Sequence, residues 1–134
     1  MHLLSAVLIG LVAVAPLAIA QDTTLECCPA DIERLSQEQV RKLVKKAQPI
    51  DPPPLSSRMH FSGTMELAIR VSAEGVVDCV SIVSGHALLY GAVIDSVRRW
   101  EFRPYKRDGL SKPFCGRIVL RYEVSDHAVK YKLV

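Results

Sequence analysis

Residues 84–104 read SGHALLYGAVIDSVRRWEFRP, and their pattern predicts the order of strand and helix at the centre of the chain. A strand is expected to end at Ser84-Gly85, and apolar residues then recur at intervals of three and four, which predicts a helix. The chain leaves that helix through Trp100 and Phe102 into Pro104. The buried face of the helix is expected to consist of Leu89, Ala92, Val93, Ser96, Val97 and Trp100.

Alternating apolar residues on either side of this run predict strands. The first strand is expected at about 64–71, the second at 76–83 and the third at about 116–124. Gly75 lies in the turn between the first two, where it can take a positive φ. The apolar parity changes near Asp78-Cys79, which predicts a β-bulge. The predicted fold is α+β: a small three-stranded antiparallel sheet (β-β-α-β) packed on a helix, with an additional N-terminal helix.

That additional helix is expected after Ser36. Ser36 and Gln39 have the spacing of a capping box, and apolar residues follow at helical intervals up to Ala47. The prolines of residues 49–54 then stop the helix. We expect a helical segment at 21–48, a domain at 49–126 and a tail at 127–134. The basic residues of the helix are expected to form a solvated face.

The first residues are typical of an export signal. Residues 3–20 are almost wholly apolar and end in Ala18-Ile19-Ala20, an Ala-x-Ala pattern like that of signal-peptidase sites. We therefore expect residues 1–20 to be a signal peptide and the protein to be periplasmic or secreted. The alternative is an uncleaved anchor in the inner membrane, and contact with a membrane is expected only in that case.

Cysteine content and charge narrow the class of protein. An exported chain is expected to have oxidised cysteines, here Cys27, Cys28, Cys79 and Cys115. A bond between neighbouring Cys27 and Cys28 would be strained, so a bridge from that pair to Cys79 or Cys115 is expected, and the sequence leaves the connectivity open. The spacing does not fit a metal knuckle, and we expect no metal and no cofactor. A net charge of +3 is too balanced for nucleic-acid binding.

No constellation of catalytic residues is visible. Ser84 and His86 lie close in sequence, but the Gly-x-Ser-x-Gly pattern of a nucleophile elbow is absent. The Ser-Gly pair is more simply a turn between a strand and a helix. We therefore expect no enzyme.

Three motifs resemble the C-terminal domain of TonB-type energy transducers. Residues 63–71 read GTMELAIRV, residues 75–85 read GVVDCVSIVSG, and residues 98–104 contain Arg-x-Trp-x-Phe-x-Pro. The family motif falls on Gly75, Ser84, Gly85, Leu89, Trp100, Phe102 and Pro104. The resemblance covers roughly residues 49–124. It implies a non-enzymatic protein-binding module of the bacterial envelope that serves transport across the outer membrane.

The resemblance also implies where a partner binds. In such domains the third strand takes up an extended segment of an outer-membrane receptor by strand addition. The expected partner-binding residues are Arg117, Val119, Arg121 and Glu123. The partner is expected to be an outer-membrane receptor or another envelope protein, and monomer and strand-exchanged homodimer both remain open.

Two alternatives stand beside this hypothesis. One is a minimal energy transducer that keeps residues 1–20 as its anchor, although the long Pro-rich arm of such proteins is missing here. The other is a small disulfide-stabilised structural or inhibitory domain that binds no added strand.

Overall fold

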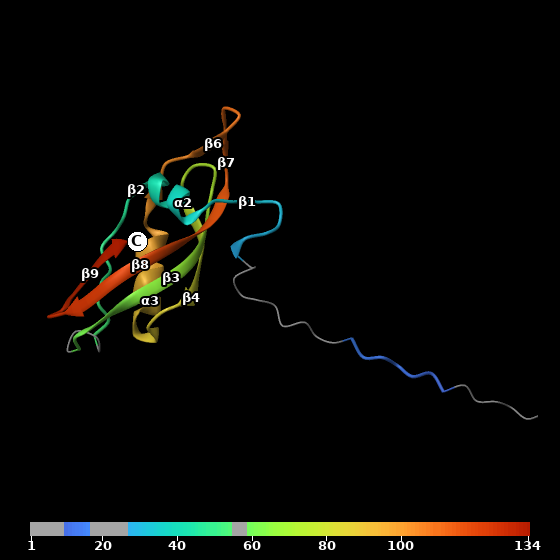
Figure 1. Ribbon diagram of the computed structural model, residues 1–134, viewed down its shortest axis with the longest axis horizontal. Coiled ribbons are helices and arrows are strands. Elements are labelled where there is room, and N and C mark those ends of the chain that lie inside the picture. The colour runs from blue at the N-terminus through green and yellow to red at the C-terminus, as the bar shows by residue number, and fades with distance from the viewer. Residues whose placement is uncertain (1–9, 17–26, 55–58) are drawn as a thin grey trace, which may run out of the picture.

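The computed structural model describes residues 10–16, 27–54 and 59–134. Within these ranges the protein is a mixed α+β structure, built mostly of strands with two short α-helices (Figure 1). The expected signal peptide and its cleavage site lie largely outside the described residues. No helix in the described ranges is long and apolar enough to cross a membrane.

The main sheet has five strands where the sequence predicts three. The strand order is β1-β8-β3-β4, and β9 pairs with β8 as well. The predicted strands correspond to β3 (Phe61–Val71), β4 (Val77–Ser84) and β8 (Phe114–Ser125). The two extra strands are β1 (Glu33–Arg34) and β9 (Ala128–Leu133). The three-stranded layout is therefore wrong, because segments outside the strand-strand-helix-strand unit join its sheet.

One face of the sheet carries the core. The run at 84–104 forms the 3-10 turn η2 (Ala87–Leu89) and the helix α3 (Tyr90–Arg98), which lies behind β3 and β8 in Figure 1. Buried residues of α3 and its flanks meet buried residues of β3 and β8. The largest of these side chains are Trp100, Phe114, Met65, Leu67, Ile69, Leu89, Ile118 and Leu120. Trp100 and Phe102 are 2% and 3% exposed, so both belong to this core.

The N-terminal helix is shorter than predicted. α2 (Gln37–Leu43) begins with the expected capping box, in which Gln39 N–H donates to Ser36 Oγ and Ser36 N–H donates to Gln39 Oε1. It ends at Leu43, because the chain turns extended at Val44 and forms β2 (Val44–Lys46).

Residues 44–46, which the sequence predicts as the end of the N-terminal helix, are a strand instead. This strand, β2, pairs with β5 (Glu101–Phe102). Arg103 stabilises the end of α2, where the chain becomes extended. Its N–H donates to the Leu43 carbonyl, and its guanidinium donates to the Lys42 carbonyl. Two last carbonyls of α2 are thereby satisfied from outside the helix.

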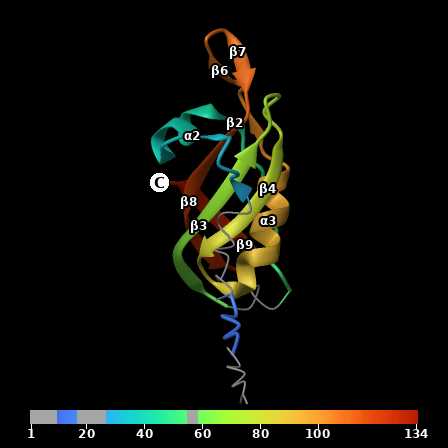
Figure 2. The same ribbon diagram turned by 90° about the vertical axis from the view of Figure 1, so that its right-hand side faces the viewer.

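A second small sheet projects beyond the main one. It is the hairpin of β6 (Tyr105–Arg107) and β7 (Leu110–Lys112), seen at the top of Figure 2. The turn at Asp108-Gly109 has positive φ at both positions, as a tight hairpin requires. The predicted bulge in β4 is confirmed, since Arg70 pairs with Cys79 while the next residue, Val71, pairs with Val77.

Candidate protein-binding surface

The sheet face opposite α3 presents the residues expected to bind a partner. Side chains of a strand alternate between the two faces. Ile118, Leu120, Tyr122 and Val124 are buried on the core side, so Arg117, Val119, Arg121 and Glu123 share the opposite face. We call this the outer face. On it, Arg117, Arg121 and Glu123 are exposed and Val119 is half-buried.

The outer face is covered at one end by the N-terminal segment. Cys79, Arg70 and Cys115 are register partners on β4, β3 and β8, so they form one row across the sheet. The disulfides Cys27–Cys79 and Cys28–Cys115 attach two neighbouring residues of the segment to the two ends of that row. The expected bridge from Cys27-Cys28 to Cys79 or Cys115 is confirmed, and the structure contains two such bridges with this connectivity.

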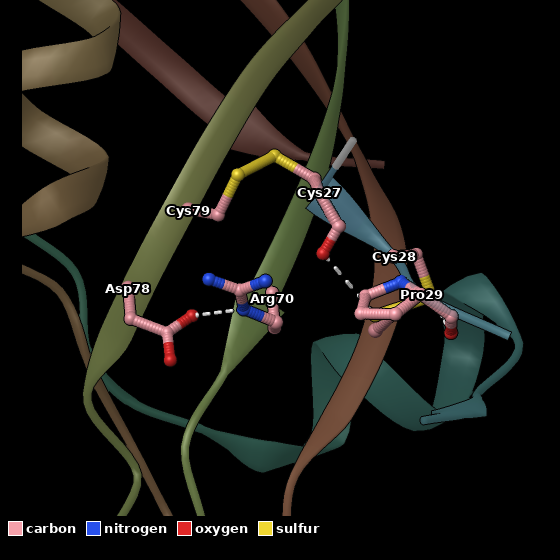
Figure 3. The surroundings of a disulfide bond; sticks show 7 residues. Cys27, Cys28, Pro29, Arg70, Asp78 and Cys79 are labelled. Carbon is pink, nitrogen blue, oxygen red and sulfur yellow. Dashed lines mark hydrogen bonds and ion pairs between the residues drawn. A yellow bond between two sulfur atoms is a disulfide. The ribbon is translucent and has the colours of Figure 1, made fainter. Parts of the chain in front are cut away.

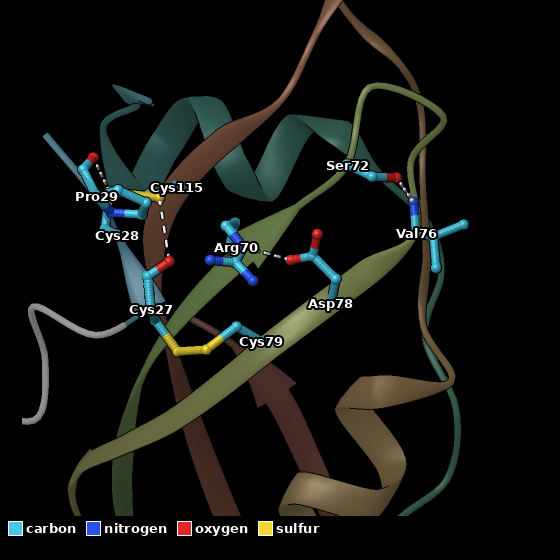
Figure 4. A network of polar contacts seen from close by, with 9 residues as sticks. All are labelled: Cys27, Cys28, Pro29, Arg70, Ser72, Val76, Asp78, Cys79 and Cys115. Carbon is cyan, nitrogen blue, oxygen red and sulfur yellow. Dashed lines mark hydrogen bonds and ion pairs between the residues drawn. A yellow bond between two sulfur atoms is a disulfide. The ribbon is translucent and has the colours of Figure 1, made fainter. Parts of the chain in front are cut away.

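Arg70 lies between the two bridges, as Figures 3 and 4 show. Its Nε donates to Asp78 Oδ1 at 2.7 Å. Asp78 is the extra residue of the bulge in β4, so the bulge turns a carboxylate toward the only charged side chain of the row. This end of the outer face is consequently closed by covalent and ionic contacts.

The edge of β8 at which a partner strand is expected to add is already covered. At its first residues β1 pairs with it in parallel, Glu33 with Phe114 and Arg34 with Cys115, and Leu35 N–H donates to the Cys115 carbonyl. This first covering segment is anchored by the hairpin β6–β7. Glu33 accepts hydrogen bonds from Arg107 at 2.5 Å and from Tyr105 at 3.1 Å. The Arg107 hydrogen bond lowers the pKa of the Glu33 carboxyl.

Helix α2 covers the next part of β8. Val40 is fully buried, and a Cβ added at Gly116 would overlap its Cγ2. Glycine at 116 therefore allows the helix to pack directly on the strand backbone.

Strand β9 covers the remainder. It pairs antiparallel with β8 without a register shift from Leu120–Leu133 to Ser125–Ala128. Beyond it, Val134 N–H donates to the Val119 carbonyl at 3.0 Å, and Gln37 Nε2 donates to the Val134 carbonyl at 2.7 Å. The segment expected as a tail thus occupies the position expected for a bound partner strand.

The inner side of β9 is joined to the core. The Tyr131 ring stacks on Trp100, with centroids 5.9 Å apart and planes inclined by 14°. Its hydroxyl donates to the Gln48 carbonyl, and burial raises its pKa. Ser96 Oγ donates to the same carbonyl and accepts from Trp100 Nε1, so β9, α3 and the Gln48 segment share one polar cluster.

Two hollows lie on the outer face. One, of about 270 Å³, lies beside the covering segments and is bounded by Arg34, Leu35, Gln37 and Arg117 among others. The other, of about 560 Å³, lies over β3, β8 and β9, and three cations and one carboxylate line it: Arg121, Lys130, Lys132 and Glu123. Sequence reasoning missed Lys130 and Lys132. Their alternation with Val129, Tyr131 and Leu133 is the signal that would have found them.

The motif residues have structural positions. Gly75 has φ +88°, and a Cβ there would overlap the Phe102 carbonyl oxygen. Gly85 has φ +147°, and its Cβ would meet the Met65 side chain. Leu89, Trp100 and Phe102 are buried, whereas Ser84 and Pro104 are exposed at the ends of the run. The motif therefore builds the turns and the core, away from the outer face.

The histidine of the run acts as a helix cap. His86 Nδ1 accepts the Leu88 N–H at 3.2 Å, and its ring lies 4.6 Å from that of Phe61. In the described ranges no group of His, Cys, Asp and Glu side chains is arranged to hold a metal ion.

Residues 51–124 match the family described as the C-terminal domain of the Gram-negative bacterial TonB protein. The chain belongs to this family. Its members are periplasmic, non-enzymatic domains of protein interaction and energy transduction, which interact with outer-membrane receptors. Comparison with curated proteins and with solved structures gave no match.

Proposed function

We propose that this protein binds an extended segment of an envelope protein by β-strand addition to β8, and that the segment takes the position that β9 holds in the free protein. One observation carries the proposal: β8 already accepts an added strand on this side, over Leu120 to Ser125, and that strand is the chain's own last segment. Backbone hydrogen bonds to such an edge are independent of sequence, so another strand of suitable side chains can replace β9.

The turn before β9 favours exchange. Asp126 and His127 have φ of +44° and +67°, the left-handed region that suits glycine. Each non-glycine residue in that region costs about 1 kcal/mol or more, with Asp at the lower end. The outward side chains of β9 are exposed, so β9 is fixed by its backbone pairing and by its half-buried inward side chains, of which Tyr131 stacks on Trp100.

The other outer strand is less suited to accept a partner. β4 ends the sheet on its side, but its register with β3 shifts at both ends, between Glu66 and Leu67 and between Arg70 and Val71. Bulges of this kind prevent edge-to-edge pairing. The bridge to Cys27 also holds the N-terminal segment against this strand.

The family supports an outer-membrane transport receptor as the partner and a periplasmic location. The Ala-x-Ala pattern at residues 18–20 supports removal of residues 1–20 as a signal peptide, after which the protein is periplasmic or secreted. If residues 1–20 are kept, the protein is a minimal anchored energy transducer. N-terminal sequencing of the exported protein separates these two functions. A purely structural or inhibitory domain, which the two disulfides would suit, predicts no strand binding at all.

Strand exchange can be tested with a synthetic peptide of residues 126–134 and the full-length chain. β9 competes from within the chain at an effective concentration of about millimolar, so the wild type should bind the peptide weakly. Tyr131→Ala removes the ring stacked on Trp100 and should raise the affinity at least tenfold. In hydrogen exchange, amides of β8 should stay protected while those of β9 in the chain lose protection.

The matched control is Tyr90→Ala. Tyr90 is a partly buried aromatic residue on α3 whose hydroxyl donates to the Gly85 carbonyl, away from β9. Its loss should leave peptide affinity unchanged. Equal affinity of the wild type and Tyr131→Ala, or protection changes confined to β4, would refute exchange at β8.

A further inference from the structure

The pairing of β8 with β9 contains one favourable and one unfavourable charge pair. On the outer face Glu123 opposes Lys130, and Arg121 opposes Lys132. Opposite charges across a strand pair are stabilising, and like charges directly opposite each other are destabilising. Arg121 and Lys132 have no ion-pair partner in the described part of the chain, whereas Arg117 donates to Glu66 Oε1 at 2.9 Å. β9 is therefore an imperfect match to β8 at one defined position.

We propose that the partner segment carries an acidic residue opposite Arg121, where β9 carries Lys132. This inference rests on the proposed strand exchange and names the chemistry of the segment that exchanges. A carboxylate at that position would replace a like-charge contact by an opposite-charge one.

The inner side of the same segment must be apolar. Leu133, Tyr131 and Val129 oppose Leu120, Tyr122 and Val124, and all three pack partly buried against the core. The middle position faces Trp100, so a large flat side chain fits it best. In the direction of β9 the partner segment reads apolar, basic, aromatic, acidic, apolar. The basic residue would lie opposite Glu123, and the acidic residue would lie opposite Arg121.

Three peptides of residues 126–134 test this pattern against the Tyr131→Ala chain: the natural sequence, Lys132→Glu and Lys132→Gln. We expect the Glu peptide to bind about fivefold more tightly than the Lys peptide, with the Gln peptide between them. The order should reverse in the double variant Tyr131→Ala with Arg121→Glu. The difference should shrink as salt is added, because the pair is exposed.

A measurement within the chain uses no peptide. Lys132→Glu in the full-length protein should hold β9 more firmly, raise the denaturant midpoint and slow hydrogen exchange in β9. Lys112→Glu is the matched control: Lys112 is an exposed lysine on β7, and the variant changes the net charge equally, outside the residues of β8 that pair with β9. Its effect on β9 exchange should be absent.

The outcomes separate this inference from the proposed function. Equal binding of the three peptides by the Tyr131→Ala chain would overturn the acidic pattern and leave strand exchange standing. Absence of binding by all three would overturn strand exchange itself. The same experiments distinguish two other ligands of this site. If the protein binds anionic vesicles through Arg121 and Lys132 and shows no preference among the peptides, the cations bind a lipid surface. A dimer that exchanges β9 between chains assigns the position to a second copy. Either would overturn the inference.

Discussion

Removing the disulfides should have a large effect on stability that can be worked out from the chain. The bridges join residues separated by 52 and 87 positions. In the chain-entropy account, closing loops of this size disfavours the unfolded state by about 4 kcal/mol for a bridge taken alone. We therefore expect the double variant Cys28→Ser with Cys115→Ser to lose up to about 4 kcal/mol of unfolding free energy.

The second bridge adds nearly as much as the first. Because Cys27 and Cys28 are neighbours, closing Cys27–Cys79 leaves Cys28–Cys115 to close only the segment between Cys79 and Cys115. The loop term depends on the logarithm of length, so the shorter segment lowers it only slightly. Removing both bridges should cost about 8 kcal/mol, which is comparable with the whole stability of 5–15 kcal/mol expected of a small domain.

Urea unfolding followed by tryptophan fluorescence measures these losses. Trp100 is the only tryptophan and is 2% exposed, so its emission reports on the core. We expect the midpoint to fall for each single-bridge variant and the quadruple variant to be mostly unfolded at 37 °C. If the reduced wild type unfolds at the same midpoint as the oxidised protein, the bridges do not constrain the unfolded chain and this reasoning is wrong.

Three further predictions concern single positions. Gly116→Ala should cost about 1–3 kcal/mol, because its methyl group would overlap Val40 where α2 packs on β8, and urea unfolding measures the loss. Arg107→Ala should raise the pKa of Glu33, and NMR titration detects this change. Because the pKa is lowered in the folded protein, the Glu33 carboxylate stabilises the fold at neutral pH, and this stabilisation is lost as the pH falls through that pKa. The free energy of unfolding of the variant should therefore fall less on acidification than that of the wild type. Trp100→Ala should cost about 3–5 kcal/mol, because a fully buried indole is lost. Since this variant has no tryptophan, urea unfolding followed by far-UV circular dichroism measures its loss.

Features of the fold could be predicted from the sequence where their cause lies within a few neighbouring residues. The capping box at Ser36 needs only a hydroxyl and an amide three residues apart. The bulge at Asp78 follows from a single change of apolar parity. Both the capping box and the bulge follow from the residues next to them, so distant contacts are not needed to predict either feature.

The coverings of β8 were not predictable in the same way. β1 has two residues, and its place depends on the bridges and on the hydrogen bonds that Glu33 accepts from the distant hairpin β6–β7. The turn at Asp126-His127 lacks the glycine that announces a tight hairpin, so β9 was expected to be a tail. The cysteine connectivity was open because neighbouring residues can reach either partner. The sheet places Cys79 and Cys115 on opposite sides of β3, a separation that the sequence does not specify.

The segments that cover the outer strands of the sheet are held by different kinds of bond. This difference determines where a partner strand can exchange. Beside β4 and the first residues of β8 the covering segment is attached through disulfides, which an oxidising compartment keeps closed. Beside the last residues of β8 the covering segment, β9, is held by backbone pairing and by half-buried inward side chains, including the Tyr131 ring on Trp100, while the turn before it has unfavourable φ. β9 can therefore leave and return without redox chemistry. A partner strand that competes for the sheet should therefore compete with β9, and the cost of releasing β9 sets how closely the partner must match β8.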